Sequence, residues 1–287
     1  MIEPIIASPE VVKYVTKRFG IHMSKKLGQN FLIDRSIVDG IVHVAKLDSE
    51  TAVLEVGPGI GTLTQGLAQS GAKVTAVELD KRLLEVLGHT LAPYKNVRVI
   101  HGDVLALNIN EVMEGKPFKV VANLPYYITT PIIMGLLENK LPLTQMVVMV
   151  QKEVADRMVA TPGSKIYGAL SVAVQYYTTP EIVLEVPPHS FLPAPAVDSA
   201  VVSCVVRKEP PVQLHSEELF FKTIKGAFAQ RRKTLANTLQ TTGLAKDVIY
   251  QILEESGIEP NRRGETLSME EFATISNKWF EWQQGEK

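Results

Sequence analysis

AVLEVGPGIG, residues 52–61, joins a short apolar run to a turn that contains three glycines. The run predicts a buried strand, and 62–69 predicts a helix after the turn. Because glycine has no Cβ, such a strand–turn–helix unit lets a ligand approach the backbone closely. The third glycine comes one position too early for the dinucleotide fingerprint Gly-x-Gly-x-x-Gly, and Thr62 stands in its place.

Strands and helices alternate along much of the chain. Strands are predicted at 74–79, 97–103, 119–123 and 145–151, and helices at 9–20, 81–91, 131–139 and 152–159. This alternation is typical of a parallel sheet covered on both faces. Two further strands, 182–186 and 200–207, have no helix between them and predict an antiparallel addition at the sheet edge.

The length of 287 residues suits about two domains. Glu209, Pro210 and Pro211 have the composition of a linker, and 216–283 predicts about four helices. We therefore expect an α/β domain over 1–208, with a basic N-terminal arm, and a small all-helical domain over 209–287.

Charge and composition exclude several classes of protein. Lys and Arg number 30 against 31 Asp and Glu, so any nucleic-acid binding must come from local patches. The single cysteine, Cys204, excludes a disulfide within the chain. The six histidines lack ligand spacing, so no metal site is expected. There is no signal-peptide pattern and no long apolar run, so we expect a cytoplasmic protein outside the membrane.

A glycine and three polar residues stand at the ends of four consecutive predicted strands: Gly57, Glu78, Asp103 and Asn123. The carboxyl ends of parallel strands meet at one edge of the sheet, where open α/β folds bind ligands. At that edge Glu78 could accept hydrogen bonds from both hydroxyls of a ribose.

Asn123 opens NLPYY, residues 123–127, the most specific local motif. The exocyclic amine of a base is a poor nucleophile, because its lone pair is delocalised into the ring. An amide oxygen and a nearby backbone carbonyl can accept its two hydrogens and stabilise charge as it forms. Pro125 would stiffen the loop, and an aromatic ring beside it could stack on the base. The motif therefore indicates chemistry on a base amine.

With these motifs, the sequence resembles the ribosomal RNA adenine dimethyltransferase family over nearly its whole length, and within it the bacterial small-subunit branch. KLGQNFL at 26–32 is similar to the family's N-terminal cofactor motif, and LEVGPGIG at 54–61 to its methionine-binding loop. Glu78, Gly102, Asp103 and NLPY at 123–126 match in order and spacing, and FLPAPAVDS at 191–199 matches a further motif.

The resemblance implies a Rossmann-like methyltransferase sheet that binds S-adenosylmethionine, with a helical C-terminal domain that binds rRNA. It implies transfer of two methyl groups to each of two adjacent adenines near the 3′ end of small-subunit rRNA, in the assembling small ribosomal subunit. A monomer is expected, because no oligomer seam is evident. The implied cofactor residues are Asn30, Leu32, Gly57, Gly59, Glu78, Asp103 and Asn123. The implied catalytic residues are Asn123, Leu124, Pro125, Tyr126, which would stack on the target adenine, and Phe191, which would close the pocket.

Two groups of cations are candidates for RNA contact. Residues 11–33 contain five cations, among them Lys25 and Lys26, and no acid. Residues 222–233 also lack acids, and 227–235 resembles the family's C-terminal signature. The candidates there are Lys222, Lys225, Arg231, Arg232 and Lys233. RNA phosphates would pair with these side chains; a solvated surface is the other interpretation.

Other functions stay open at this point. Methyltransferases of large-subunit rRNA, which confer macrolide resistance, share the cofactor motifs, but VDS at 197–199 and the helical domain favour the small-subunit branch. A DNA adenine methyltransferase usually has Asp or Ser before Pro-Pro-Tyr. A non-catalytic binding protein is disfavoured by the intact Asn123, and a nicotinamide dehydrogenase by the glycine spacing.

Overall fold

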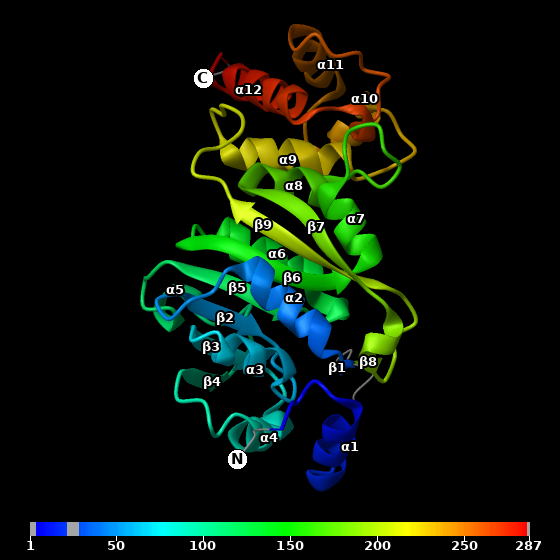
Figure 1. Cartoon of the computed structure of the whole chain (residues 1–287). Helices are drawn as coiled ribbons and strands as arrows, with labels where there is room; N and C mark the ends of the chain where they lie inside the picture. The colour runs from blue at the N-terminus through cyan, green and yellow to red at the C-terminus, as the bar shows by residue number, and fades with distance from the viewer. Residues whose placement is uncertain (1–3, 22–28, 286–287) are drawn as a thin grey trace. The chain divides into compact units, whose positions relative to one another are not determined.

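A computed structural model describes residues 4–21 and 29–285 (Figure 1). These residues form two compact units. The first consists of the described residues up to Ala155 together with Pro180–Val206, and the second of Asp156–Thr179 and the described residues from Arg207 onward. Each unit has an apolar core of its own.

The first unit is built on a seven-stranded sheet in the order β4-β3-β2-β5-β6-β9-β7 (Figure 1). The parallel part consists of β2 (Ala52–Val56), β3 (Lys73–Glu78), β4 (Val97–His101), β5 (Phe118–Asn123) and β6 (Leu143–Gln151). The later strands are β9 (Ser199–Val206), which pairs antiparallel with β6, and β7 (Thr178–Val186) at the edge. Strand order therefore reverses beside β2, the point at which such sheets form a ligand crevice.

Helices cover the sheet because each has one apolar face. On one face lie α2 (Arg35–Ala45) and α3 (Thr62–Gln69), which share a core with β2, β3, β5, β6 and β9. Two further helices pack against the strands. α4 (Lys81–Thr90) lies beside β3 and β4, and α6 (Thr129–Glu138) lies beside β6. The N-terminal α1 (Pro9–Arg18) packs on α4, and α5 (Ile109–Val112) is a single turn. The side chains of Ser8, Asp34 and Asp80 cap α1, α2 and α4.

A second, two-stranded sheet joins distant parts of the chain. In it β1 (Phe31–Leu32) pairs antiparallel with β8 (Phe191–Leu192), with Leu32 opposite Phe191. This pairing holds the end of the motif at 26–32 beside the start of the motif at 191–199.

The second unit is helical. Its helices are α8 (Ala169–Tyr177), α9 (Glu217–Ala227), α10 (Leu235–Thr238), α11 (Lys246–Glu255) and α12 (Met269–Gly285), and α7 (Lys152–Val159) leads into it. Large buried side chains from these helices make its core, among them Phe220, Leu253, Phe272 and Trp279. Within the described part of the chain, no helix is long and apolar enough to cross a membrane.

The expected α/β sheet with an antiparallel edge and a helical C-terminal region is confirmed. Two helices were not predicted, α2 and α8. The second unit also takes in 156–179, whereas the sequence placed the boundary between 208 and 209. The reason is α8, whose Val172 and Tyr176 are buried in the same core as Phe220.

Candidate active site

A cleft opens at the carboxyl ends of β2, β3 and β5. It encloses about 1060 Å³, part of it open to solvent. Nearly all the residues predicted from the sequence for cofactor binding and catalysis line it: Asn30, Leu32, Gly57, Gly59, Glu78, Asp103, Asn123, Leu124, Pro125 and Tyr126. Segments from five parts of the chain thus meet in one place, as expected for a site at the reversal of strand order.

The glycine turn after β2 forms one wall of the cleft. Gly57, Gly59 and Gly61 have φ values of +69°, +61° and +94°, a region that side chains with a Cβ rarely adopt. A Cβ on Gly59 would lie 3.1 Å from the ring of Phe31. The Gly57 amide donates to the carbonyl of Val77 at 2.9 Å, which fixes the turn to β3.

Glu78 stands at the end of β3 and is 5% exposed. Its carboxylate accepts from the amide of Asp80 at 2.7 Å and from the amide of Gly59 at 3.3 Å. Burial raises the pKa of Glu78, and these backbone hydrogen bonds act in the opposite direction. The side chain therefore lies beside the glycine turn, within the cleft.

Glu55 is a second buried acid that the sequence analysis missed. It is 1% exposed, lines the cleft, and its Oε2 atom has no hydrogen-bond partner among the described residues. Burial, with a smaller contribution from the charge of Glu78, raises the pKa of Glu55 to about 8. Thr62 is similar, since its hydroxyl is buried at the cleft and lacks a described partner. A buried polar atom without a partner carries a cost that a polar ligand can remove.

Asn123 ends β5 at the opposite wall. It is half-buried, and no described residue forms a hydrogen bond with its side-chain amide. The following loop is ordered locally, since Leu124 donates its amide to Met149 at 3.0 Å and Pro125 accepts from the hydroxyl of Thr129 at 2.9 Å. A Cβ on Gly57 would lie 3.7 Å from the Pro125 ring, so this loop and the glycine turn are in contact distance.

Tyr126 and Phe191 have different surroundings. The Tyr126 phenol forms a 2.6 Å hydrogen bond with the hydroxyl of Ser199, which is buried at the start of β9. Burial raises the pKa of Tyr126. Phe191 is 2% exposed and packs with Leu32 in the core beneath the two-stranded sheet, rather than on the wall of the cleft.

Two further residues mark the mouth of the cleft. Asp103 is exposed and lies two residues beyond the end of β4, and one of its oxygens accepts from the amide of Leu105 at 3.0 Å. Tyr127 is 51% exposed and was not predicted as a site residue. Burial and the charges of Asp103 and Glu78 raise the pKa of Tyr127. Its place as the second tyrosine of the NLPYY motif is the sequence feature that could have identified it as a site residue.

The cations predicted for RNA contact in the second unit are all exposed. Two lie on α9, and three in the turn between α9 and α10: Lys222, Lys225, Arg231, Arg232 and Lys233. The ammonium of Lys222 lies 5.0 Å from the centroid of the Trp279 ring. Lys25 and Lys26 lie outside the described residues.

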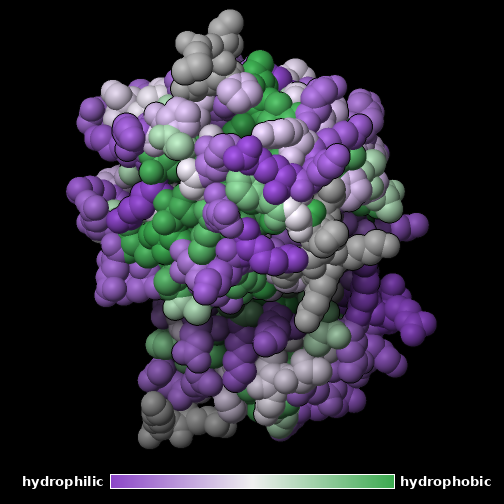
Figure 2. All heavy atoms as spheres, turned by 90° about the horizontal axis from the view of Figure 1, so that it is seen from below, coloured by the Kyte–Doolittle hydropathy of each residue, from purple (hydrophilic) through white to green (hydrophobic). Residues whose placement is uncertain are grey.

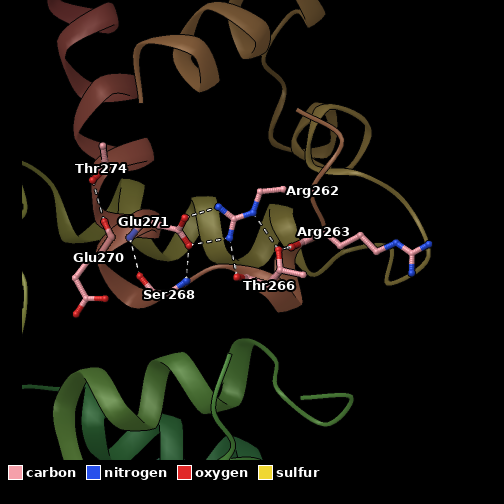
Figure 3. Close-up of polar contacts among 7 residues, drawn as sticks. All are labelled: Arg262, Arg263, Thr266, Ser268, Glu270, Glu271 and Thr274. Carbon is pink, nitrogen blue, oxygen red and sulfur yellow. Dashed lines mark hydrogen bonds and ion pairs between the residues drawn. The ribbon is translucent and has the colours of Figure 1, made fainter. Parts of the chain in front are cut away.

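An adjacent segment fixes the backbone that follows this basic turn. The amides of Leu235 and Ala236 donate to the carbonyls of Arg262 and Pro260 at 2.8 and 3.2 Å. The guanidinium of Arg262 binds the carboxylate of Glu271 and the carbonyl of Thr266, while Arg263 extends away from this cluster (Figure 3). The amide of Ser268 also donates to Glu271 at 2.8 Å, and together these contacts hold the segment against the start of α12.

Over residues 4–21 and 29–285, no three His, Cys, Asp or Glu side chains come together as a group able to hold a metal ion.

Comparisons with known proteins agree with this geometry. The family model for ribosomal RNA adenine dimethylase matches residues 20–280. Ribosomal RNA small subunit methyltransferase A of Alkaliphilus metalliredigens is 50% identical over 279 residues, covering 95% of this chain and 97% of the relative. The protein of the same name from Bacillus mycoides is 52% identical over 281 residues, covering 95% and 96%.

Solved structures show the same architecture. A dimethyladenosine transferase from Plasmodium falciparum matches with a TM-score of 0.74 and 25% identity, covering 89% of this chain and 98% of that one. The 23S rRNA methyltransferase ErmE matches with a TM-score of 0.67 and 26% identity, covering 87% and 99%.

Proposed function

This chain belongs to the ribosomal RNA adenine dimethylase family, and we propose that it is the enzyme that dimethylates two adjacent adenosines near the 3′ end of small-subunit rRNA. The methyl donor is S-adenosylmethionine, and the acceptor is the exocyclic amine of each adenine. The similarity to small-subunit methyltransferases over 95% of the chain supports this substrate.

The cleft suits such a donor. Glu78 and Asp103 bring carboxyl groups to it, and Glu55 and Thr62 each offer a buried polar atom without a described partner. The cofactor, when bound, supplies a methyl group made electrophilic by a positively charged sulfur. Glu78 would hold the ribose hydroxyls, Asp103 the adenine amine, and the turn at Gly57 and Gly59 the methionine part. Asn30 and Leu32 would contact it from the β1 side.

The catalytic work falls to the loop after β5. The Asn123 amide oxygen and the Leu124 carbonyl accept the two hydrogens of the target amine, which frees its lone pair for attack and stabilises the developing charge. Tyr126 stacks on the target adenine. The remaining requirement is alignment of amine and methyl group, which the contact between this loop and the glycine turn favours. Phe191 packs against Leu32, which lines the cleft, but does not line the cleft itself. Its role in closing the pocket is therefore indirect.

One observation carries the proposal: the glycine turn, Glu78 and the Asn123 side-chain amide, which has no hydrogen-bond partner among the described residues, converge in a single cleft. The test is tritium transfer from labelled S-adenosylmethionine to unmethylated small ribosomal subunits. We expect label in dimethyladenosine, and none after Asn123→Ala, with cofactor affinity within a few-fold of the parent. Asn139→Ala, an exposed amide at the end of α6, is the matched control and should retain transfer.

Large subunits and duplex DNA serve as alternative substrates in the same assay. Label in large subunits alone would support a second candidate function, methylation of 23S rRNA. The structural match to the 23S rRNA methyltransferase ErmE is the reason to test it. Normal turnover by Asn123→Ala would contradict the proposed mechanism.

The remaining proposals concern the setting of the reaction. The protein acts in the cytoplasm, on a small subunit still being assembled, and as a monomer. We assign methyl transfer to the first unit, with the basic N-terminal arm, and rRNA binding to the helical second unit, which contains the described residues from Arg207 onward. The exposed cations of α9 and the following turn support the second assignment. Light scattering of the purified protein tests the monomer.

A further inference from the structure

The α1 helix has an exposed face that does not line the cleft. Lys13, Tyr14, Lys17 and Arg18 are all exposed, and Tyr14 is 56% exposed. The opposite side of the helix, with Val12, Val15 and Thr16, is buried. We call the four exposed residues the α1 basic face.

The charges of this face are not balanced locally. Glu10 is the only acid between residues 4 and 33 of the sequence. Within the described parts of the chain, no ion pair reaches Lys13 or Lys17. Lys13 and Lys17 are one helical turn apart, so they repel each other. An anionic partner would relieve that repulsion.

An aromatic side chain lies among the cations. The Arg18 guanidinium donates to the Tyr14 hydroxyl at 2.9 Å and lies 5.7 Å from the centroid of the Phe19 ring. Cations interleaved with an exposed tyrosine suit RNA, because the cations pair with phosphates and the ring stacks on an unpaired base.

The face is presented by a firmly docked helix. Gln65 accepts from the amide of Ile6 at 2.8 Å and donates to the carbonyl of Pro4 at 3.0 Å, which fixes the segment before α1. The buried side of α1 shares a core with Ile60 of the glycine turn and with Leu83, which lines the cleft. Binding at α1 therefore pays little ordering entropy and acts on the same unit as the active site.

The α1 helix precedes the part of the chain that the family model matches. That model matches residues 20–280, and α1 ends at Arg18. The face seen from below in Figure 2 carries both hydrophilic and hydrophobic areas.

We propose that the α1 basic face is a second RNA-contact surface, which binds phosphates of the substrate rRNA and stacks Tyr14 on an unpaired base. This inference rests on the proposed function, since it assumes that the substrate is rRNA. It assigns the RNA contact expected from the cation-rich segment 11–33 to one face of a helix and adds Tyr14 to it, beside the contact proposed on the helical unit.

The test removes the charges without touching the buried side of α1. Lys13→Gln, Lys17→Gln and Arg18→Gln are combined in one variant. The matched control replaces Lys73, Lys95 and Lys116 by Gln; these exposed lysines lie at the amino ends of β3, β4 and β5, away from the cleft. Binding of deproteinised small-subunit rRNA is measured against salt concentration, together with KM and kcat on small subunits.

We expect the logarithmic salt slope of the α1 variant to flatten by about 2, since each lost phosphate contact removes roughly 0.7–0.9. KM for subunits should rise several-fold, with kcat and cofactor affinity unchanged. The control should match the parent protein. Tyr14→Ala should weaken binding without altering the slope, and Tyr14→Phe should restore it.

Other outcomes separate the two proposals. If the parent protein methylates small subunits but the α1 variant keeps its slope and KM, the inference is overturned and the function stands. If KM on intact subunits rises while binding to naked rRNA is unchanged, α1 contacts a ribosomal protein, which also overturns it. If the parent protein labels no small subunits, the proposed function itself fails.

Discussion

The hydroxyls of Tyr126 and Ser199 lie 2.6 Å apart and form a hydrogen bond between the loop after β5 and the start of β9. Ser199 is fully buried, and β9 is paired with β6 along its length. The ring proposed to stack on the target adenine is therefore held from the antiparallel edge of the sheet, which gives the VDS motif at 197–199 a structural purpose.

Removal of this hydrogen bond should slow the reaction without affecting cofactor binding. Ser199→Ala and Tyr126→Phe should each lower kcat by roughly fivefold, the equivalent of about 1 kcal/mol, because the ring stays but loses its fixed orientation. The double variant should lose no more than either single one. Ser203→Ala, on the same strand but bonded to Gln145, should be neutral. Additive losses would show that the two hydroxyls act separately.

Glu78 should contribute to cofactor affinity in two ways. Glu78→Ala should weaken S-adenosylmethionine binding by about 1.5–3 kcal/mol, measured by calorimetry, because it removes a buried acceptor. It also removes the acceptor of the Gly59 amide, which orders the turn. Glu78→Gln keeps one acceptor oxygen and should lose less. Glu85→Ala, exposed on α4, is the control. Unchanged affinity in Glu78→Ala would remove this residue from the site.

Glu55 should make the stability of the free protein depend on pH. Its pKa is about 8 in the folded protein, against 4.5 for an ordinary glutamate. Between these values the folded state holds a proton that the unfolded chain has released. The free energy of unfolding should therefore fall as pH rises through this window, by up to about 1.4 kcal/mol per pH unit.

Glu55→Gln should abolish that part of the pH dependence, because an amide does not titrate. Urea unfolding of both proteins near pH 5.5 and pH 7.5 checks this, and the variant should gain stability relative to the parent at the higher pH. Glu50→Gln, on an exposed loop, should change nothing. Parallel curves for Glu55→Gln and the parent would show that Glu55 is ionised in the fold.

The basic turn after α9 should supply salt-dependent RNA affinity. Replacing Arg231, Arg232 and Lys233 by Gln should reduce the steepness of the salt dependence by about 2–3, as phosphate contacts are lost. Circular dichroism should stay unchanged, because these side chains are exposed and the fixed backbone lies in neighbouring residues. A salt dependence equal to that of the parent would mean that the turn is only a solvated surface.

Gly57, Glu78, Asp103 and Asn123 were predictable because they follow strands with clear apolar runs, whereas Asn30 and Leu32 were implied only by the family resemblance. The two missed helices lacked such a signal. Six of the nine residues of α8 are buried and its sequence, ALSVAVQYY, contains no charged residue, so it lacks the polar face that marks an amphipathic helix. In α2, Ile37, Val38, Ile41 and Val42 surround Gly40, a composition equally suited to a strand.

Glu55 and Ser199 were missed for another reason. The sequence shows an acid and a serine among apolar residues. Only the packing reveals that Glu55 is buried with one oxygen unpartnered among the described residues, and that Ser199 bonds to Tyr126. The two-residue strands β1 and β8 are too short for any periodic pattern. The sequence therefore could not show that Phe191 packs in the core beneath the two-stranded sheet, and not on the wall of the cleft.

The pairing of Leu32 with Phe191 has a consequence for how the protein is made. During synthesis the glycine turn and Glu78 leave the ribosome early, yet the segment at Phe31 and Leu32 has no strand to pair with until Phe191 and Leu192 have emerged. The nascent chain therefore cannot complete the part of the cleft wall formed by Phe31 and Leu32 until most of the chain has been translated.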